Sequence, residues 1–275
     1  MNKKQLIMEK ALDLFAKQGF EATSVQQITD YCGISKGAFY LVFKSKDELI
    51  IALIDHFMMQ IVSDIDYVVK HKNDTQLLTE FYYTIYQSFY RQSDFAKVFM
   101  QEQSHSLNQQ LIHKIRYYDK LVSNIILDMI DRLYGSEVQN TQYDLMYCIK
   151  GFINTYLQLF VFSNLPFDLK LLSESLVEKT NLLARHMTIS FMSKELFQVI
   201  EPINDPITKE QLIEIVKQKI EEMEESIEKD SLILLKQQVL EPSFSGAIIK
   251  GLLENIRNHP HCKWISFLLR QYFAF

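Results

Sequence analysis

The chain has 275 residues, of which 48% are hydrophobic, and this is enough for one large or two modest domains with buried cores. Only seven glycines and five prolines interrupt it, which favours long helices over turn-rich sheets. A formal net charge of −5 disfavours a protein that coats polyanions in general. The sequence therefore predicts an all-α fold in which any surface for an anionic partner is local.

The positive charge is concentrated near the N-terminus. Residues 1–50 carry seven lysines and six acidic residues, which leaves a net charge of −6 on the other 225 residues. Between Tyr31 and Lys46 there are three lysines and no acidic residue. A nucleic-acid duplex would repel the acidic remainder, so only this N-terminal segment is suited to approach one.

A stretch that begins at Thr23 has the pattern of two short helices joined by a glycine turn. Thr23 or Ser24 can cap the first helix. Its apolar positions follow the three-and-four spacing of one buried face: Val25, Ile28 and Cys32. Gly33 can adopt the turn conformation that ends this helix, and Ser35 can cap a second helix over residues 36–43. The two helices are thereby held at a tight angle.

The second helix separates into two faces. The apolar side carries Phe39, Val42 and Phe43. The opposite side carries Lys36, Gly37, Tyr40, Leu41 and Lys44. On that side Lys36 favours phosphate, Gly37 leaves room for a close approach, and Tyr40 offers a hydroxyl on a stiff ring. This is the arrangement of a helix-turn-helix unit, although a helical corner with no nucleic-acid role has the same pattern.

Residues 2 to about 50 resemble the DNA-binding domain of the tetracycline-repressor (TetR) family. The family pattern is matched in register by Thr23, Ser24, Ile28, Gly33, Ile34, Ser35, Lys36, Gly37, Tyr40, Phe43 and Lys46. The preceding segment, with Leu14, Phe15, Gly19 and Phe20, also resembles the first helix of that domain and its exit. Ser45 and Glu48 form a capping box that starts the next helix and places Lys46 in its first turn.

The resemblance implies specific DNA contacts. Phosphate contacts are expected from Thr23 or Ser24, Tyr40 and Lys46, and groove contacts from Ser35, Lys36 and Gly37. Position 41 is often polar or aromatic in such helices, and here it is Leu41, which can touch a thymine methyl but donates no hydrogen bond.

The rest of the first 195 residues has the periodicity of long helices. One helix should run from Lys46 to about Val69, and others near 76–91, 95–106, 108–134, 142–163 and 169–192. This layout is similar to the ligand-binding and dimerisation body of the same family. The 142–163 segment is apolar nearly all round, so with 169–192 it could form a four-helix interface with a second copy. Alternatively, the 142–163 segment is the central helix of a monomeric core.

Aromatic residues are frequent in this body and suggest a pocket for a small apolar effector. The residues predicted to bind it are Phe99, Gln103, Tyr118, Phe152 and Tyr156. Simple core packing is the alternative for each of these aromatic side chains.

Residues 196–275 predict additional helices. Thr208 and Gln211 can form a capping box at the start of one long amphipathic helix that reaches about Leu240. Pro242 and Pro260 then bound two shorter helices, 244–257 and 261–273. The apolar C-terminal run must be covered by the body, by an extended dimer interface or by a partner protein.

The predicted domains are 1–47, which binds DNA, 48–195, which binds the effector and dimerises, and 196–275, of unknown role. Unpaired cysteines and the absence of a leader-like or membrane-spanning stretch indicate the cytoplasm, and no cofactor or metal is expected. Because no motif of catalysis is present, we expect no enzyme. The hypothesis is a homodimeric repressor that binds a palindromic DNA operator and is released by a small apolar effector. The alternative is a helical adaptor whose C-terminal helices bind a protein.

Overall fold

The computed structural model describes residues 3–92, 109–162, 166–200, 207–259 and 261–275, and these are helical with no strand among them. The chain divides into two compact units, residues 1–201 and residues 202–275. The all-α prediction is confirmed. The helix predicted over 95–106 lies outside the described residues.

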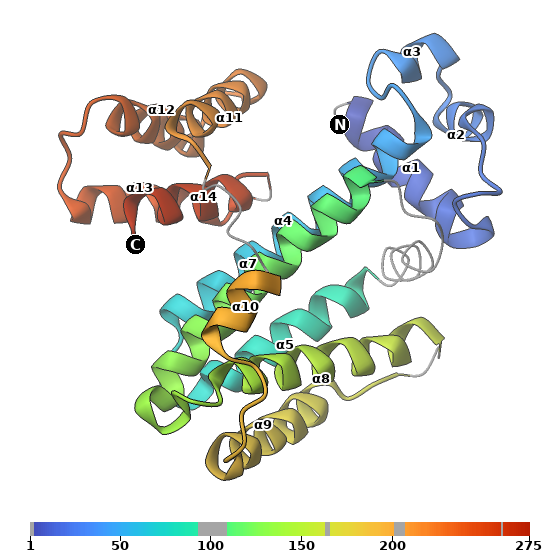
Figure 1. The fold of residues 1–275 in the computed structure, drawn as a ribbon. Coiled ribbons are helices and arrows are strands. Elements are labelled where there is room, and N and C mark those ends of the chain that lie inside the picture. The colour runs from blue at the N-terminus through green and yellow to red at the C-terminus, as the bar shows by residue number, and fades with distance from the viewer. Residues whose placement is uncertain (1–2, 93–108, 163–165, 201–206, 260) are drawn as a thin grey trace. The chain divides into compact units, whose positions relative to one another are not determined.

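The first unit begins with a three-helix head. The head consists of α1 (Lys3–Gln18), α2 (Val25–Cys32) and α3 (Lys36–Tyr40), and α2 packs against both of the others (Figure 1). Its core is formed by fully buried apolar side chains: Ile7, Ala11, Phe15, Ile28 and Phe39. Helix α3 ends at Tyr40, three residues before the predicted end, because the chain turns back there and Ser45 starts the next helix.

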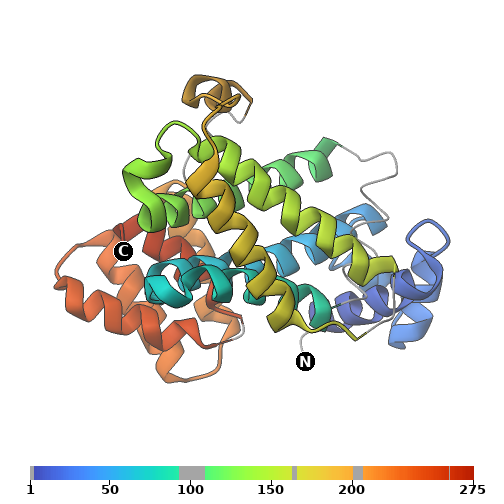
Figure 2. The same cartoon turned by 90° about the horizontal axis from the view of Figure 1, so that it is seen from below.

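The long helix α4 (Lys46–His71) connects the head to the rest of the first unit and contacts α1. The other helices of this unit are α5 (Asp74–Arg91), α7 (Gln109–Tyr134), α8 (Gln142–Phe162), α9 (Leu169–His186) and α10 (Lys194–Ile200). Helix α4 packs on α5 and α7, while α5 packs on α8 and α9, as two views show (Figures 1 and 2). A single helix therefore joins the head to the packed body.

Helix α9 ends six residues earlier than the pattern predicted. The following segment runs in a non-helical path along α8, where the Asp144 carboxylate accepts hydrogen bonds from the backbone N–H groups of Phe191 and Met192, both at 3.1 Å. The hydroxyl of Ser190 donates to the same oxygen at 2.9 Å. The carboxylate thus accepts hydrogen bonds from backbone N–H groups that a longer helix would have bonded to its own carbonyls.

The second unit consists of α11 (Lys209–Glu222), α12 (Ile227–Leu240), α13 (Gly246–Arg257) and α14 (Lys263–Phe273). The prediction of one continuous helix over α11 and α12 is wrong. Ser226 caps a new helix by accepting a hydrogen bond from the Lys229 backbone N–H at 3.2 Å, and Ile227, the first residue of that helix, is 71% exposed.

The apolar C-terminal run lies within this second unit. Helix α14 packs on α11 and α13, and its apolar side chains are buried: Ile265, Phe267, Leu268 and Leu269. Among the described residues, no helix combines the length and the hydropathy that a membrane crossing needs.

Candidate nucleic-acid interface

The two helices of the turn are fixed by caps at both ends. The Ser24 hydroxyl accepts a hydrogen bond from the Gln27 backbone N–H at 3.2 Å, and the Gln27 side chain accepts one from the Ser24 backbone N–H at 2.8 Å. Gly33 ends α2 in the left-handed conformation, with φ 65° and ψ 34°. Because residues with a Cβ rarely adopt this conformation, glycine at this position sets the angle between α2 and α3.

Helix α3 has one buried and one exposed face. The Ser35 hydroxyl caps it by accepting from the Ala38 backbone N–H at 3.2 Å, and Phe39 is fully buried beneath it. The exposed positions are Ser35, Lys36, Gly37, Tyr40 and Leu41, and we call these five residues the reading surface. The structure thus brings together the residues predicted to contact the DNA groove.

Thr23 and Ser24 are placed very differently. The Thr23 side chain is fully buried, where its hydroxyl donates to the Gly19 carbonyl at 2.7 Å and accepts from the Gln18 amide at 3.0 Å. It is therefore not available to a phosphate. Of the two residues only Ser24 is exposed at the start of α2.

Lys46 is held inside the head. Its Nζ donates to the carbonyl oxygens of Phe20 at 2.7 Å and Glu21 at 3.5 Å, and it lies 4.2 Å from the centroid of the Phe20 ring. An ammonium group has three N–H donors, so one remains for a phosphate. Lys46 thus ties the first turn of α4 to the loop that follows α1.

One basic feature was not predicted from the sequence. The ammonium groups of Lys10 and Lys17 lie 5.1 Å and 5.9 Å from the ring centroid of Tyr31, which is 44% exposed. The seven-residue spacing of the two lysines places them on one face of α1, and this spacing could have revealed the pair. The contacts add positive charge beside the end of α2.

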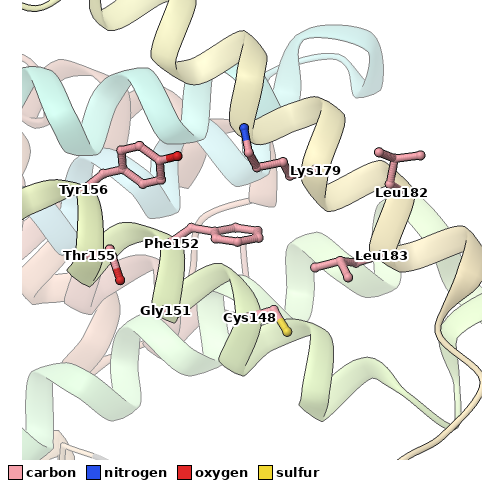
Figure 3. A pocket seen from close by; sticks show the side chains of 8 residues that line it. All are labelled: Cys148, Gly151, Phe152, Thr155, Tyr156, Lys179, Leu182 and Leu183. Carbon is pink, nitrogen blue, oxygen red and sulfur yellow. The ribbon is translucent and has the colours of Figure 1, made fainter.

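Two of the predicted effector residues, Phe152 and Tyr156, line an open groove of about 700 Å³ between α8 and α9 (Figure 3). The other lining residues are Cys148, Gly151, Thr155, Lys179, Leu182 and Leu183. Tyr118 is not in this groove: it is buried against α4, where its hydroxyl donates to the Asp55 carboxylate at 2.9 Å. Phe99 and Gln103 lie outside the described residues.

Buried tyrosines join the helices of the body. The Tyr82 hydroxyl lies 2.8 Å from the Thr180 hydroxyl of α9, and the Tyr86 hydroxyl donates to the Phe152 carbonyl of α8 at 3.2 Å. Burial raises the pKa of both phenols, and it also raises the pKa of Tyr118, to which the nearby Asp55 carboxylate adds. These phenols keep their protons near neutral pH, and those of Tyr86 and Tyr118 donate hydrogen bonds.

Comparisons with known proteins agree with this geometry. Residues 7–53 match the model of the bacterial regulatory proteins of the tetR family. The HTH-type transcriptional regulator YerO of Bacillus subtilis is 29% identical to this chain, and the match covers 92% of this chain and 89% of the YerO sequence. The structure of a TerR/AcrR-family regulator from Aquifex aeolicus is similar, with 27% sequence identity and a TM-score of 0.52. The match covers 66% of this chain and 99% of the Aquifex chain.

The transcriptional regulator FadR of Bacillus subtilis, solved in complex with stearoyl-CoA, shares the fold, with a TM-score of 0.57. The match covers 68% of this chain and 100% of the FadR chain, with 22% sequence identity. The capped turn, the exposed α3 face and the helical body together define a helix-turn-helix transcriptional regulator. Within that class, its DNA-binding head is of the TetR family, whose model matches residues 7–53.

Proposed function

We propose that this regulator is a homodimeric repressor, which binds a palindromic operator and is released from it by a small apolar effector. The observation that carries the DNA-binding part is the reading surface, whose five residues are exposed on a helix fixed by caps at Ser24, Gly33 and Ser35. In a two-fold dimer two such surfaces would meet two half-sites about one helical turn apart.

The pairing of two copies is supported by the outer faces of α8 and α9. Leu171 and Leu182 on α9 are 63% and 52% exposed, and Leu159 on α8 is 46% exposed. Leu182 also lines the groove between the two helices. Two copies of this pair would bury these leucines in a four-helix arrangement.

An apolar effector is supported by the walls of the same groove. A ligand held against Phe152 and Tyr156 would alter the packing of α8 and α9, the helices that we propose to pair the protomers. Any ligand that prefers one spacing of the two heads changes operator affinity by linkage. The stearoyl-CoA bound to the FadR neighbour makes long acyl chains the first compounds to examine.

The first test is selection of DNA from a random duplex library at two salt concentrations, followed by sequencing. Enrichment of a palindrome is expected, together with a dimer mass by light scattering. Leu182→Glu should reduce the measured mass to that of a monomer. Leu240 is also exposed but lies in the second unit, so Leu240→Glu should leave the mass unchanged. No enrichment at either salt concentration would contradict the repressor function.

The effector is then tested with the selected operator. Long-chain acyl compounds should lower operator affinity, and Phe152→Ala should weaken this response while leaving affinity without ligand close to wild type. An affinity that no apolar compound changes would contradict the sensing part. The three free cysteines fit a reducing compartment, and we place the regulator in the cytoplasm. We propose no enzymatic activity for it.

A further inference from the structure

Leu41 is more exposed than any other large hydrophobic side chain in the described part of the chain. Its exposed fraction is 87%, compared with 52% for the neighbouring Tyr40. The backbone around it is firmly held, because its N–H donates to the Gly37 carbonyl at 3.1 Å. Phe39 and Phe43 on either side are buried in the head, so the turn directs Leu41 outward.

The rest of the reading surface is polar or small. Ser35, Lys36 and Tyr40 can donate hydrogen bonds, and Gly37 has no side chain, so Leu41 is the one aliphatic side chain of the five residues. An exposed leucine gains free energy only from an apolar surface. In the major groove the apolar group that a base pair presents is the C5-methyl of thymine.

We propose that Leu41 reads thymine in the operator through contact with its C5-methyl group. This inference rests on the proposed DNA-binding function and adds to it the identity of one base in each half-site. Lys36 and Tyr40 hold the helix on the duplex, and Leu41 supplies discrimination that involves no hydrogen bond. Because the side chain carries no charge, its contribution does not depend on counterion release.

The test uses the operator obtained by library selection, with each thymine replaced in turn by deoxyuridine, which lacks only the methyl group. Wild-type protein should lose about fourfold in affinity at one position of each half-site, the value for one buried methyl-sized group. Leu41→Ala should lose affinity for the thymine operator and show no further loss with uracil at that position. Leu41→Met keeps an apolar side chain of similar reach and should retain the uracil penalty.

The controls separate the outcomes. Leu41→Ala should unfold at the wild-type temperature, because the side chain is exposed, and its salt dependence should equal that of wild type. Wild-type binding that is indifferent to uracil at every position would overturn the inference, as would an unchanged uracil profile in Leu41→Ala. Either result would leave the proposed repressor standing, because the operator itself would have been selected. Failure to select any operator would remove both.

Discussion

The Nζ atom of Lys46 lies 2.7 Å from the backbone oxygen of Phe20, which is 26 residues earlier in the chain. The contact joins the first turn of α4 to the loop that follows α1, and the Phe20 ring packs edge-on against Phe15 in the core of the head, with centroids 5.1 Å apart. The head and the long helix are thus connected by a charged hydrogen bond as well as by the chain. A change in the direction of α4 would be passed to the reading surface through this contact.

Replacing Lys46 by Met should therefore destabilise the protein as well as weaken DNA binding. Loss of the hydrogen bonds to the Phe20 and Glu21 carbonyls should lower the free energy of unfolding by about 1–3 kcal/mol, measured by urea denaturation. Lys44→Met removes the same charge from an exposed side chain and is the matched control. Equal free energies of unfolding for the two variants would show that the Lys46 hydrogen bonds contribute nothing to stability.

Tyr40 and Lys36 should affect DNA binding in different ways. Tyr40→Phe removes a phosphate contact and should weaken binding to all sequences alike, while Lys36→Met should also reduce preference for the operator over random DNA. Affinities for both DNAs at several salt concentrations give the measurement. The salt slope should fall by about 1 for Lys36→Met, which loses a charge, and should stay at the wild-type value for Tyr40→Phe, which does not. A uniform loss for Lys36→Met would assign it to phosphate alone.

Thr23 and Ser24 provide a neighbouring pair with opposite burial. Thr23→Val keeps the shape but leaves the Gly19 carbonyl and the Gln18 amide without the Thr23 hydroxyl, which should cost about 1–3 kcal/mol of stability. Ser24→Ala removes an exposed helix cap and should cost about 1 kcal/mol. Because Thr23 is buried, Thr23→Val should bind the operator with wild-type affinity under conditions in which both proteins are folded. A weaker affinity of the folded variant would place this hydroxyl on the DNA.

High pH should destabilise the first unit. Burial raises the pKa of Tyr82, Tyr86 and Tyr118 above the ordinary value of about 10, and it raises the pKa of Tyr134 to about 12. The unfolded chain loses these protons first, so stability is complete below about pH 10 and falls as the pH rises toward the folded-state values. Each of the three buried tyrosines, Tyr82, Tyr86 and Tyr118, contributes up to about 1.4 kcal/mol per pH unit, and the half-buried Tyr134 contributes less.

Urea denaturation at pH values on both sides of that limit measures the slope. Tyr82→Phe removes one of the ionising groups and should make the decline shallower, although it also loses the hydrogen bond to Thr180 at neutral pH. An alkaline slope that is the same in wild type and Tyr82→Phe would contradict the role assigned to this phenol.

Removal of residues 202–275 should leave a folded regulator. The second unit has its own core, which includes Leu232, Leu253 and Leu269, and the first unit keeps the head and helices α4, α5 and α7 to α10. The truncated chain should therefore retain its helical spectrum and operator affinity. If it also loses a protein partner that the full chain captures, the adaptor role is favoured, whereas an insoluble product would show that the second unit supports the fold.

Local sequence determined much of the head and of the helical layout. The caps at Ser24, Ser35 and Ser45 and the turn at Gly33 depend on the side chains and φ preferences of single residues, so they could be read without the fold. The exposure of Lys36, Tyr40 and Leu41 followed from helical periodicity for the same reason. These features involve neighbours within about four positions along the chain.

Other features were decided only by contacts between distant segments. The burial of Thr23, the tie from Lys46 to Phe20 and the place of Tyr118 against Asp55 join residues whose proximity arises from packing. The end of α9 at His186 likewise depends on Asp144 in α8, which holds the chain that follows through Met192, 48 positions later. Periodicity identifies which side chains are apolar or exposed, but the partner that each polar group finds is a property of the folded chain.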